Sequence, residues 1–360
     1  MSKLELTPYS TSQGHARVVD CIADQRYSRR DFVRSAVLAA LLAAQNPSHG
    51  QESEDSYAGG LVFQDIERFQ RAHARIRRGA SAISAMEWYI GGGTDGLKAY
   101  TKTYGLAAVD FAASLANYPK FYARLTDVRK RNRPYEADIA RAAHRLRVLV
   151  PALPEVPIYF FVGVMGHGAT VKEVTTAPEV QGLGVLVPIE NLSRSGETEI
   201  ESARWASLDD LSQLTTHELA HVAQVQYQGL VRYRVIYRER ARGTHLAYAI
   251  REGGADFLSQ LASGRLRARH RYLLEREAEL WREFSKLLYQ PAGASRGWFS
   301  GSGEHPLDRP PQLGYAIGWS MCRLFYHRSS DKAVALREIL SANELEDFER
   351  IAEPYRQEFS

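Results

Sequence analysis

The chain of 360 residues has an ordinary globular composition, with 44% hydrophobic and 24% charged residues. Its net charge of +4 is a mild excess of positive charge. The arginine-rich stretches 124–147 and 265–282 are interleaved with acidic residues at helical spacing, which is typical of solvated helix faces. We therefore expect no nucleic-acid partner.

Residues 1–44 have the pattern of an export signal. Ser28-Arg29-Arg30-Asp31-Phe32 resembles the twin-arginine consensus, and the short apolar run 35–44 follows it. This run is too short to cross a bilayer, which needs about 20 residues. We expect an exported protein, periplasmic or extracellular, with no membrane span; the alternative is a short buried or amphipathic helix in a cytosolic protein. Cleavage would remove Cys21 and leave Cys322, which we expect in the core, without a disulfide partner.

The rest of the chain divides into three stretches. Residues 45–60 are polar and acidic and indicate a linker, residues 61–150 form an N-terminal helical region, and residues 151–360 contain the remaining motifs. Glycines within 91–96 and the turn at 117–119 interrupt the helical region.

Two strands are expected early in the third stretch. The β-branched and aromatic run Ile158–Val164 predicts a buried strand, and Gly184–Glu190 predicts a second one. Pro188 lacks the N–H that a central strand donates, so it favours an edge position for the second strand. An edge strand beside a metal-binding helix can pair with an extended peptide.

The pentapeptide His217-Glu218-Leu219-Ala220-His221 lies in a segment of helical periodicity. Ser207 and Asp210 form a capping signature at its start, and Gly229 follows its last turn. The pattern predicts one helix over 208–228 with the histidines well inside it.

Histidines four positions apart on a helix share one face, so His217 and His221 can bind the same metal ion. Glu218 then lies where a general base is needed to take a proton from a water activated by zinc. The alternative is an accidental match in a binding module that holds no zinc.

The third ligand decides the class of site. A metzincin would have glycine and histidine where the chain has Gln224 and Tyr227, which excludes that class. A second predicted helix, with Thr244 as N-cap and Gly264 as stop, offers carboxylates instead.

On this second helix, Glu252 and Asp256 are four positions apart and share a face. One carboxylate can bind the metal while the other accepts a hydrogen bond from a ligand histidine. The alternative is a pair of solvated helix charges. Gly253 and Gly254 each cost about 1 kcal/mol relative to alanine inside a helix, so we expect close packing on the helix that contains the histidines.

These motifs together resemble a known family. The HELAH pentapeptide followed by Glu252-Gly253-Gly254-Ala255-Asp256-Phe257 resembles the gluzincins, the thermolysin-like metallopeptidases. It is more similar to a predicted zinc-dependent protease family related to a bacterial gliding-motility lipoprotein. Further segments with that family's patterns extend the resemblance over roughly residues 60–345: 88–97, 156–163, 184–190 and 309–319.

The resemblance implies a zinc metallopeptidase acting on a peptide or protein, with His217, His221 and Glu252 as zinc ligands and Asp256 supporting a ligand histidine. It also implies an α+β fold: a mostly helical zincin core with a small mixed sheet whose edge strand lies beside the metal-binding helix. The alternative from another class is a zinc-containing accessory or binding protein of the cell envelope without turnover.

Four further residues are candidates with smaller roles. Tyr315, in the family-like LGY segment, is the first candidate for a donor to the oxyanion, and His305 is the second. Tyr315 is equally compatible with a packed core aromatic, and His305 with a solvated loop residue. His245 is the fallback metal ligand, and His167 lies in an isolated glycine loop.

Overall fold

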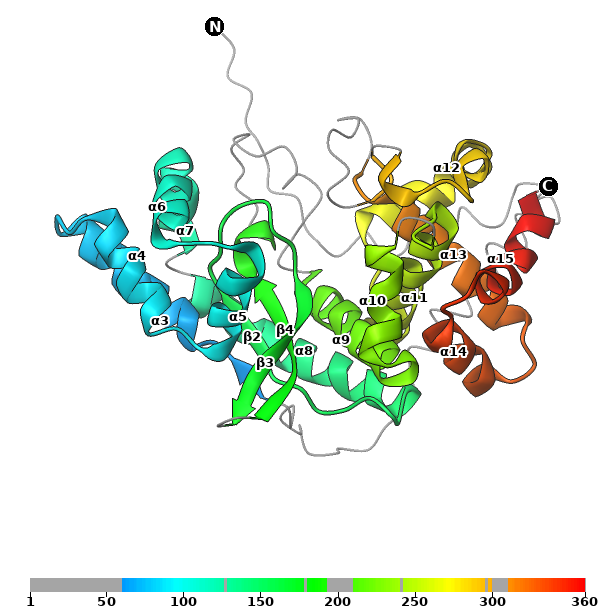
Figure 1. Ribbon diagram of the computed structural model, residues 1–360, viewed down its shortest axis with the longest axis horizontal. Coiled ribbons are helices and arrows are strands. Elements are labelled where there is room, and N and C mark those ends of the chain that lie inside the picture. The colour runs from blue at the N-terminus through cyan, green and yellow to red at the C-terminus, as the bar shows by residue number, and fades with distance from the viewer. Residues whose placement is uncertain are drawn as a thin grey trace, which may run out of the picture. The chain divides into compact units, whose positions relative to one another are not determined.

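The computed structural model describes residues 60–125, 128–177, 180–192, 210–239, 242–294, 297–299 and 310–359 (Figure 1). These residues belong to one compact unit, Ser53–Ser360. The expected export signal at 1–44, all but the last residue of the linker at 45–60, and His305 lie outside the described residues. Among the described residues, no helix combines the length and apolarity needed to cross a membrane.

Helices make up most of the first part of this unit. In chain order they are α3 (Gln64–Arg77), α4 (Ala82–Gly91), α5 (Asp95–Tyr104), α6 (Ala108–Asn117), α7 (Pro119–Leu125) and α8 (Val128–Leu149). The two predicted interruptions are confirmed. Thr94 caps α5 by accepting a hydrogen bond from the backbone N–H of Leu97, and Pro119 begins α7, where its missing N–H costs nothing.

The sheet has four strands, β1 (Leu61–Val62), β2 (Ile158–Phe161), β3 (Thr170–Ala177) and β4 (Val180–Pro188), in the order β1-β2-β4-β3. The pairs β1–β2 and β2–β4 are parallel and β3–β4 is antiparallel, so the sheet is mixed. Figure 1 shows it between the N-terminal helices, of which α3 and α5 contact it, and α9, which contacts β3 and β4. The expected α+β architecture, mostly helical with a small mixed sheet, is confirmed.

The edge position predicted for the strand with Pro188 is wrong. β4 lies between β2 and β3, and β3, which the sequence analysis missed, is the edge strand next to α9. Pairing between β3 and β4 begins at Thr170 and Leu186. Pro188 therefore lies beyond Thr170, the first residue of β3, so on that side of β4 no strand is paired with it.

The predicted strand Ile158–Val164 ends early, at Phe161, because side chains satisfy the backbone after it. The hydroxyl of Tyr89 donates to the carbonyl of Val162 at 2.8 Å, and Tyr122 donates to the carbonyl of Gly163 at 3.1 Å. The N–H of Gly163 donates to the buried carboxylate of Glu190 at 2.8 Å.

The second part of the unit is helical. Its helices are η1 (Ile189–Leu192), α9 (Leu211–Gln228), α10 (Leu230–Arg238), α11 (His245–Ser263), α12 (Ala268–Phe284), η4 (Ser285–Leu287), η5 (Ala292–Ala294), α13 (Leu313–Arg328), α14 (Lys332–Ser341) and α15 (Leu345–Phe359). The thiol of Cys322 is buried in α13, and burial raises its pKa, as expected of a core cysteine.

Both predicted site helices are present. The N-cap Thr244 accepts from the N–H of Ala247 at 3.2 Å, and Gly264 ends α11 in the left-handed conformation, as predicted. For α9, the predicted stop at Gly229 is confirmed, and the helix begins after Asp210; residues 207–209 of the predicted start lie outside the described part. The helix α9 is buried on all sides, packed against α8, α10, α11 and α14 and the sheet.

The paired glycines of α11 do have a packing reason, although the expected partner is wrong for one of them. A Cβ at Gly253 would overlap the backbone of Gly318 and Trp319 in α13, so the close approach is to α13 and not to α9. Gly254 faces Ile339 of α14 and the side chain of Gln224 in α9. This close contact holds α11, the helix that contains Glu252, against α13.

Candidate metal centre

Three ligand-type side chains from two helices converge at one point. His217 and His221 come from α9 and Glu252 from α11, and all three are buried. The two Nε2 atoms are 3.1 Å apart, and Oε2 of Glu252 lies 3.4 Å from Nε2 of His217 and 3.2 Å from Nε2 of His221. Ligand atoms about 2.0–2.1 Å from a tetrahedral zinc ion stand about 3.3 Å apart, so these separations match a tetrahedral face.

The chemistry of these three atoms calls for a cation between them. Two neutral imidazole nitrogens and a carboxylate oxygen are all acceptors, and acceptors repel at such short separations. Burial by itself lowers the pKa of His217, but hydrogen bonds to Asp256 and Glu252 outweigh burial and raise its pKa to about 9. Metal binding at these atoms would compete with protonation of His217, because ligand histidines must be deprotonated.

The ring of His221 is fixed in the orientation a ligand needs by Gln224, one turn further along α9. Nε2 of Gln224 donates to the carbonyl of Arg251 at 2.9 Å, so the amide oxygen must face the histidine. That oxygen lies 2.8 Å from Nδ1 of His221. Nδ1 therefore carries a hydrogen and donates, which leaves the lone pair of Nε2 for a metal.

Asp256 orients the ring of His217 in the same way as Gln224 orients that of His221. Nδ1 of His217 donates to Oδ1 of Asp256 at 2.8 Å. The carboxylate also accepts from Nε and Nη2 of Arg269, at 3.0 and 2.7 Å to Oδ2, and from Nε2 of His270 at 2.9 Å. Burial alone would raise the pKa of Asp256, but Arg269 and His270 hold it well below its usual range, so the group is ionised and only accepts.

The remaining oxygen of Glu252 is held by a tyrosine. The hydroxyl of Tyr237 in α10 donates to Oε1 of Glu252 at 2.7 Å, which leaves Oε2 facing the histidines. Burial, followed by the charge of Glu252, raises the pKa of Tyr237 well above its usual value, so the phenol stays protonated as a donor. All three candidate ligands thus have a hydrogen-bond partner that aims the ligand atom.

Glu218 lies beside the three ligand atoms without belonging to them. Its side chain is only 5% exposed, and burial raises the pKa of the carboxyl, against the lowering effect of His217 and His221. The charge of Glu218 also acts on Lys172 of the edge strand β3 and on Tyr104 of α5. The carboxyl group is therefore close enough to β3 and α5 for its charge to be felt there.

The other predicted residues have different outcomes. The ring of Tyr315 is parallel to that of His217, with centroids 6.1 Å apart and 3° between the planes, so the structure brings Tyr315 to the site. His245 is buried at the start of α11, where it contacts the carbonyl of Gln290 at 2.8 Å and the ring of Phe284, and is not part of the ligand cluster. His167 packs against the ring of Tyr104. His305 lies outside the described residues.

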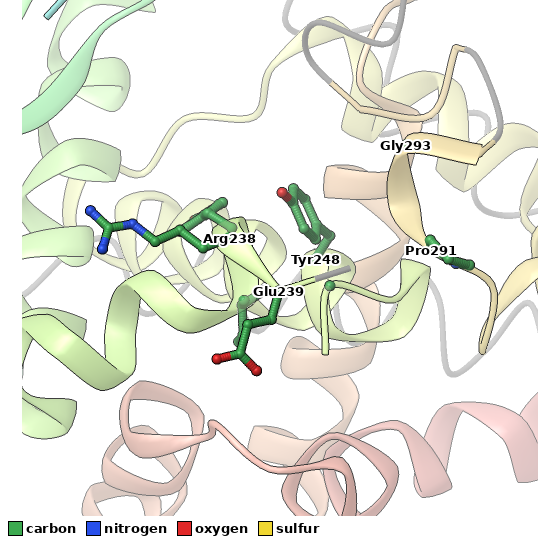
Figure 2. A pocket seen from close by; sticks show the side chains of 8 residues that line it. Arg238, Glu239, Tyr248, Pro291 and Gly293 are labelled. Atoms are coloured by element: carbon green, nitrogen blue, oxygen red, sulfur yellow. The ribbon is translucent and has the colours of Figure 1, made fainter. Parts of the chain in front are cut away.

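A pocket of about 330 Å³ borders the site through Tyr237. Its lining consists of Ile236, Tyr237, Arg238, Glu239, Gly243, Tyr248, Pro291 and Gly293. Figure 2 shows Arg238 and Pro291 on opposite sides of the Tyr248 ring. Tyr237 thus donates to a candidate ligand through its hydroxyl and also lines this pocket.

The sequence analysis missed four residues of the site: Gln224, Tyr237, Arg269 and His270. Gln224 was used only to exclude metzincins, although its position three residues after His221 places it on the same helix face. Tyr237 and Arg269 come from helices without a metal-binding pattern. No local signal distinguishes them from other aromatic and basic residues in the same stretches.

Comparisons of the chain with protein-family models, with curated proteins and with solved structures gave no match. The class of site is therefore defined by the chain's own residues. It is a buried group of two histidines and one glutamate that could hold a metal ion, within a mostly helical α+β protein.

Proposed function

We propose that this protein is a zinc metallopeptidase of the gluzincin type, with His217, His221 and Glu252 as zinc ligands. The observation that carries the proposal is the convergence of three aimed ligand atoms at 3.1–3.4 Å beside a buried carboxyl group that is not a ligand. Two histidines and one carboxylate are a common ligand set of catalytic zinc, which keeps one coordination position open.

Glu218 is the general base of the proposed reaction. A zinc ion bound at the three ligands would supply a Lewis acid that polarises a carbonyl and lowers the pKa of water. Glu218 takes the proton from the attacking water and passes it to the leaving amine. A raised pKa suits both steps, because the carboxyl group then binds and releases a proton closer to neutral pH.

The edge strand β3 is the proposed support for the substrate. Among the described residues, β3 pairs with one strand only, β4, and it contacts α9. An extended peptide can add to such an edge through main-chain hydrogen bonds. Since Glu218 acts electrostatically on Lys172 of β3, a peptide along this strand would pass close to the base.

Tyr315 is the proposed donor to the oxyanion that forms on the substrate carbonyl. Its ring stacks on that of His217, and the guanidinium of Arg269 lies 5.1 Å from the centre of the same ring. A positive charge over the ring stabilises partial negative charge on the phenol and so suits a hydrogen-bond donor to an anion.

We further propose that the signal pattern in 1–44 exports the protein, and that its substrates are peptides or proteins outside the cytoplasm.

Metal analysis tests the ligand assignment. Wild type, Glu218→Gln and Glu252→Gln would be purified as full chains, loaded with zinc and analysed for metal per chain, with Glu239→Gln as the control for loss of a nearby carboxylate. We expect stoichiometric zinc in wild type, Glu218→Gln and Glu239→Gln, and a sharp loss in Glu252→Gln. Full zinc in Glu252→Gln would reject Glu252 as a ligand.

Cleavage of a peptide library, followed by mass spectrometry, tests the activity. Wild-type protein should cleave peptides and Glu218→Gln should not. Stoichiometric zinc without cleavage of any peptide would favour the accessory or binding protein of the cell envelope. Absence of zinc after reconstitution would exclude both functions.

A further inference from the structure

Arg267 has two shielded polar atoms that nothing in the described protein satisfies. Its Nε and Nη2 are cut off from solvent and have no hydrogen-bond partner among the described residues. The residue as a whole is partly exposed. Burial lowers the pKa of Arg267 to about 10, which leaves the group positively charged at neutral pH.

Arg267 lies next to the metal site. It is the N-cap residue of α12, and Arg269 and His270 in the first turn of that helix hold Asp256, the partner of His217. Arg267 is also one of the charges that lower the pKa of Glu218, after the two histidines and against the effect of burial. Arg267 therefore directly precedes the turn of α12 that supports His217 through Asp256.

The nearby acidic groups do not neutralise Arg267. Asp256, Asp210 and Glu218 act on it through space, but no ion pair joins it to any of them in the described part of the chain. The carboxylate of Asp256 already accepts hydrogen bonds from Arg269, His270 and His217. A shielded cation without a partner is costly, which indicates that an anion belongs there when the protein acts.

A second buried polar group without a hydrogen-bond partner among the described residues lies in α9, the helix that contains both histidines. Gln213 precedes His217 by four residues in α9 and so shares its face of the helix. It is completely buried, and neither its Oε1 nor its Nε2 has a hydrogen-bond partner among the described residues. An amide of this kind offers one donor and one acceptor, which matches a peptide group.

The free atoms of Arg267 define the shape of the missing anion. Nε and Nη2 lie on one edge of the planar guanidinium, and their N–H bonds are parallel. This fork fits the two oxygens of a carboxylate in a bidentate pair. A carbonyl oxygen would satisfy only one of the two donors.

We propose that Arg267 binds a carboxylate of the peptide substrate next to the scissile bond. The inference rests on the proposed peptidase function and narrows it to substrates with a carboxylate close to the cleavage site. The carboxylate is either the C-terminal one, which would make the protein a carboxypeptidase, or the side chain of an aspartate or glutamate. Gln213 would bind the adjacent peptide group.

Peptide binding tests this proposal without turnover. Zinc-loaded full-length Glu218→Gln protein would be titrated calorimetrically with N-acetylated hexapeptide libraries free of acidic side chains, as C-terminal carboxylates and as carboxamides. A third library of carboxamides would contain Asp and Glu. The same titrations with Arg267→Gln and Arg267→Lys added would measure the role of the guanidinium, and Arg265→Gln, which removes an exposed arginine two residues away, is the control.

We expect the carboxylate library to bind about 10- to 100-fold more tightly than the neutral carboxamides, the range of a charge-assisted bidentate pair. Arg267→Gln should abolish this preference, Arg267→Lys should restore part of it, and Arg265→Gln should leave it unchanged. If the acidic carboxamides bind as tightly as the free carboxylates and depend on Arg267, the side chain is the source of the carboxylate.

Equal binding of carboxylates and neutral and acidic carboxamides, or a preference unchanged in Arg267→Gln, would overturn the proposal. If Arg267→Gln does not fold, the comparison of carboxylate with carboxamide in the Glu218→Gln protein decides alone. Cleavage by wild type without any carboxylate preference would leave the peptidase function and remove this inference. A carboxylate preference that depends on Arg267, without cleavage of any peptide, would support carboxylate binding by Arg267 and count against the peptidase function.

Discussion

Replacing Asp256 by asparagine is expected to weaken metal binding indirectly, because Asp256 is not itself a ligand but holds the ligand His217 in place. The carboxylate accepts from Nδ1 of His217 and from both Arg269 and His270. An asparagine has one acceptor oxygen, and Arg269 would take it. The NH₂ group would then face Nδ1 of His217 and favour the tautomer with the hydrogen on Nε2, which cannot bind a metal.

The size of the effect follows from two contributions. Loss of a hydrogen-bond partner behind a ligand histidine weakens metal binding about 10- to 100-fold, or about 1.4–2.8 kcal/mol. The side chain of Arg269 is only 7% exposed and that of Asp256 is fully buried. Removing one partner of such a buried pair costs about 3–5 kcal/mol of folding stability, so the metal-stripped variant should also melt at a lower temperature.

Two measurements check this prediction: competition with a fluorescent zinc chelator for affinity, and thermal denaturation with and without EDTA for stability. Asp138→Asn is the control, because Asp138 pairs with Arg141 and Arg265 at the surface and is not in contact with the site. Zinc affinity of Asp256→Asn within twofold of wild type would refute the role given to this residue.

Three further changes have defined outcomes. Gly253→Ala should destabilise the fold by about 3 kcal/mol or more in urea unfolding, because its Cβ would overlap the backbone of Gly318; unchanged stability would mean that the two helices are not in contact there. Gln224→Ala should lower zinc affinity about tenfold in the chelator assay by releasing His221, and an effect as large as that of a lost ligand would contradict a purely orienting role. Burial raises the pKa of Glu190 to about 7, so its protonated form stabilises the fold below about pH 4.5 and this contribution is lost as the pH rises through 7. The stability difference between Glu190→Gln and wild type should therefore grow in favour of the variant over that range, and a difference independent of pH would show that Glu190 titrates normally.

The sequence by itself determined those features that depend on neighbours along the chain. Thr244 and Gly264 mark the two ends of α11, because a cap residue interacts only with the backbone of the helix end next to it. His217 and His221 face the same point because helical periodicity places residues four apart on one face, and the same rule places Glu252 and Asp256 together. These local rules were enough to nominate the two histidines and to leave Glu252 and Asp256 as the candidates for the third ligand, between which the family resemblance favoured Glu252.

Only the tertiary structure decided which distant residues meet. Tyr237 reaches Glu252 from α10, and Arg269 reaches Asp256 from the start of α12; neither approach has a local signal. The edge of the sheet was misplaced for the same reason. Whether a strand is an edge depends on which other strand pairs with it, and Pro188 avoids the cost of its missing N–H because β3 ends before reaching it. The physical reason is common to all three cases: the free energy of burial and pairing depends on contacts between distant elements, which no single segment encodes.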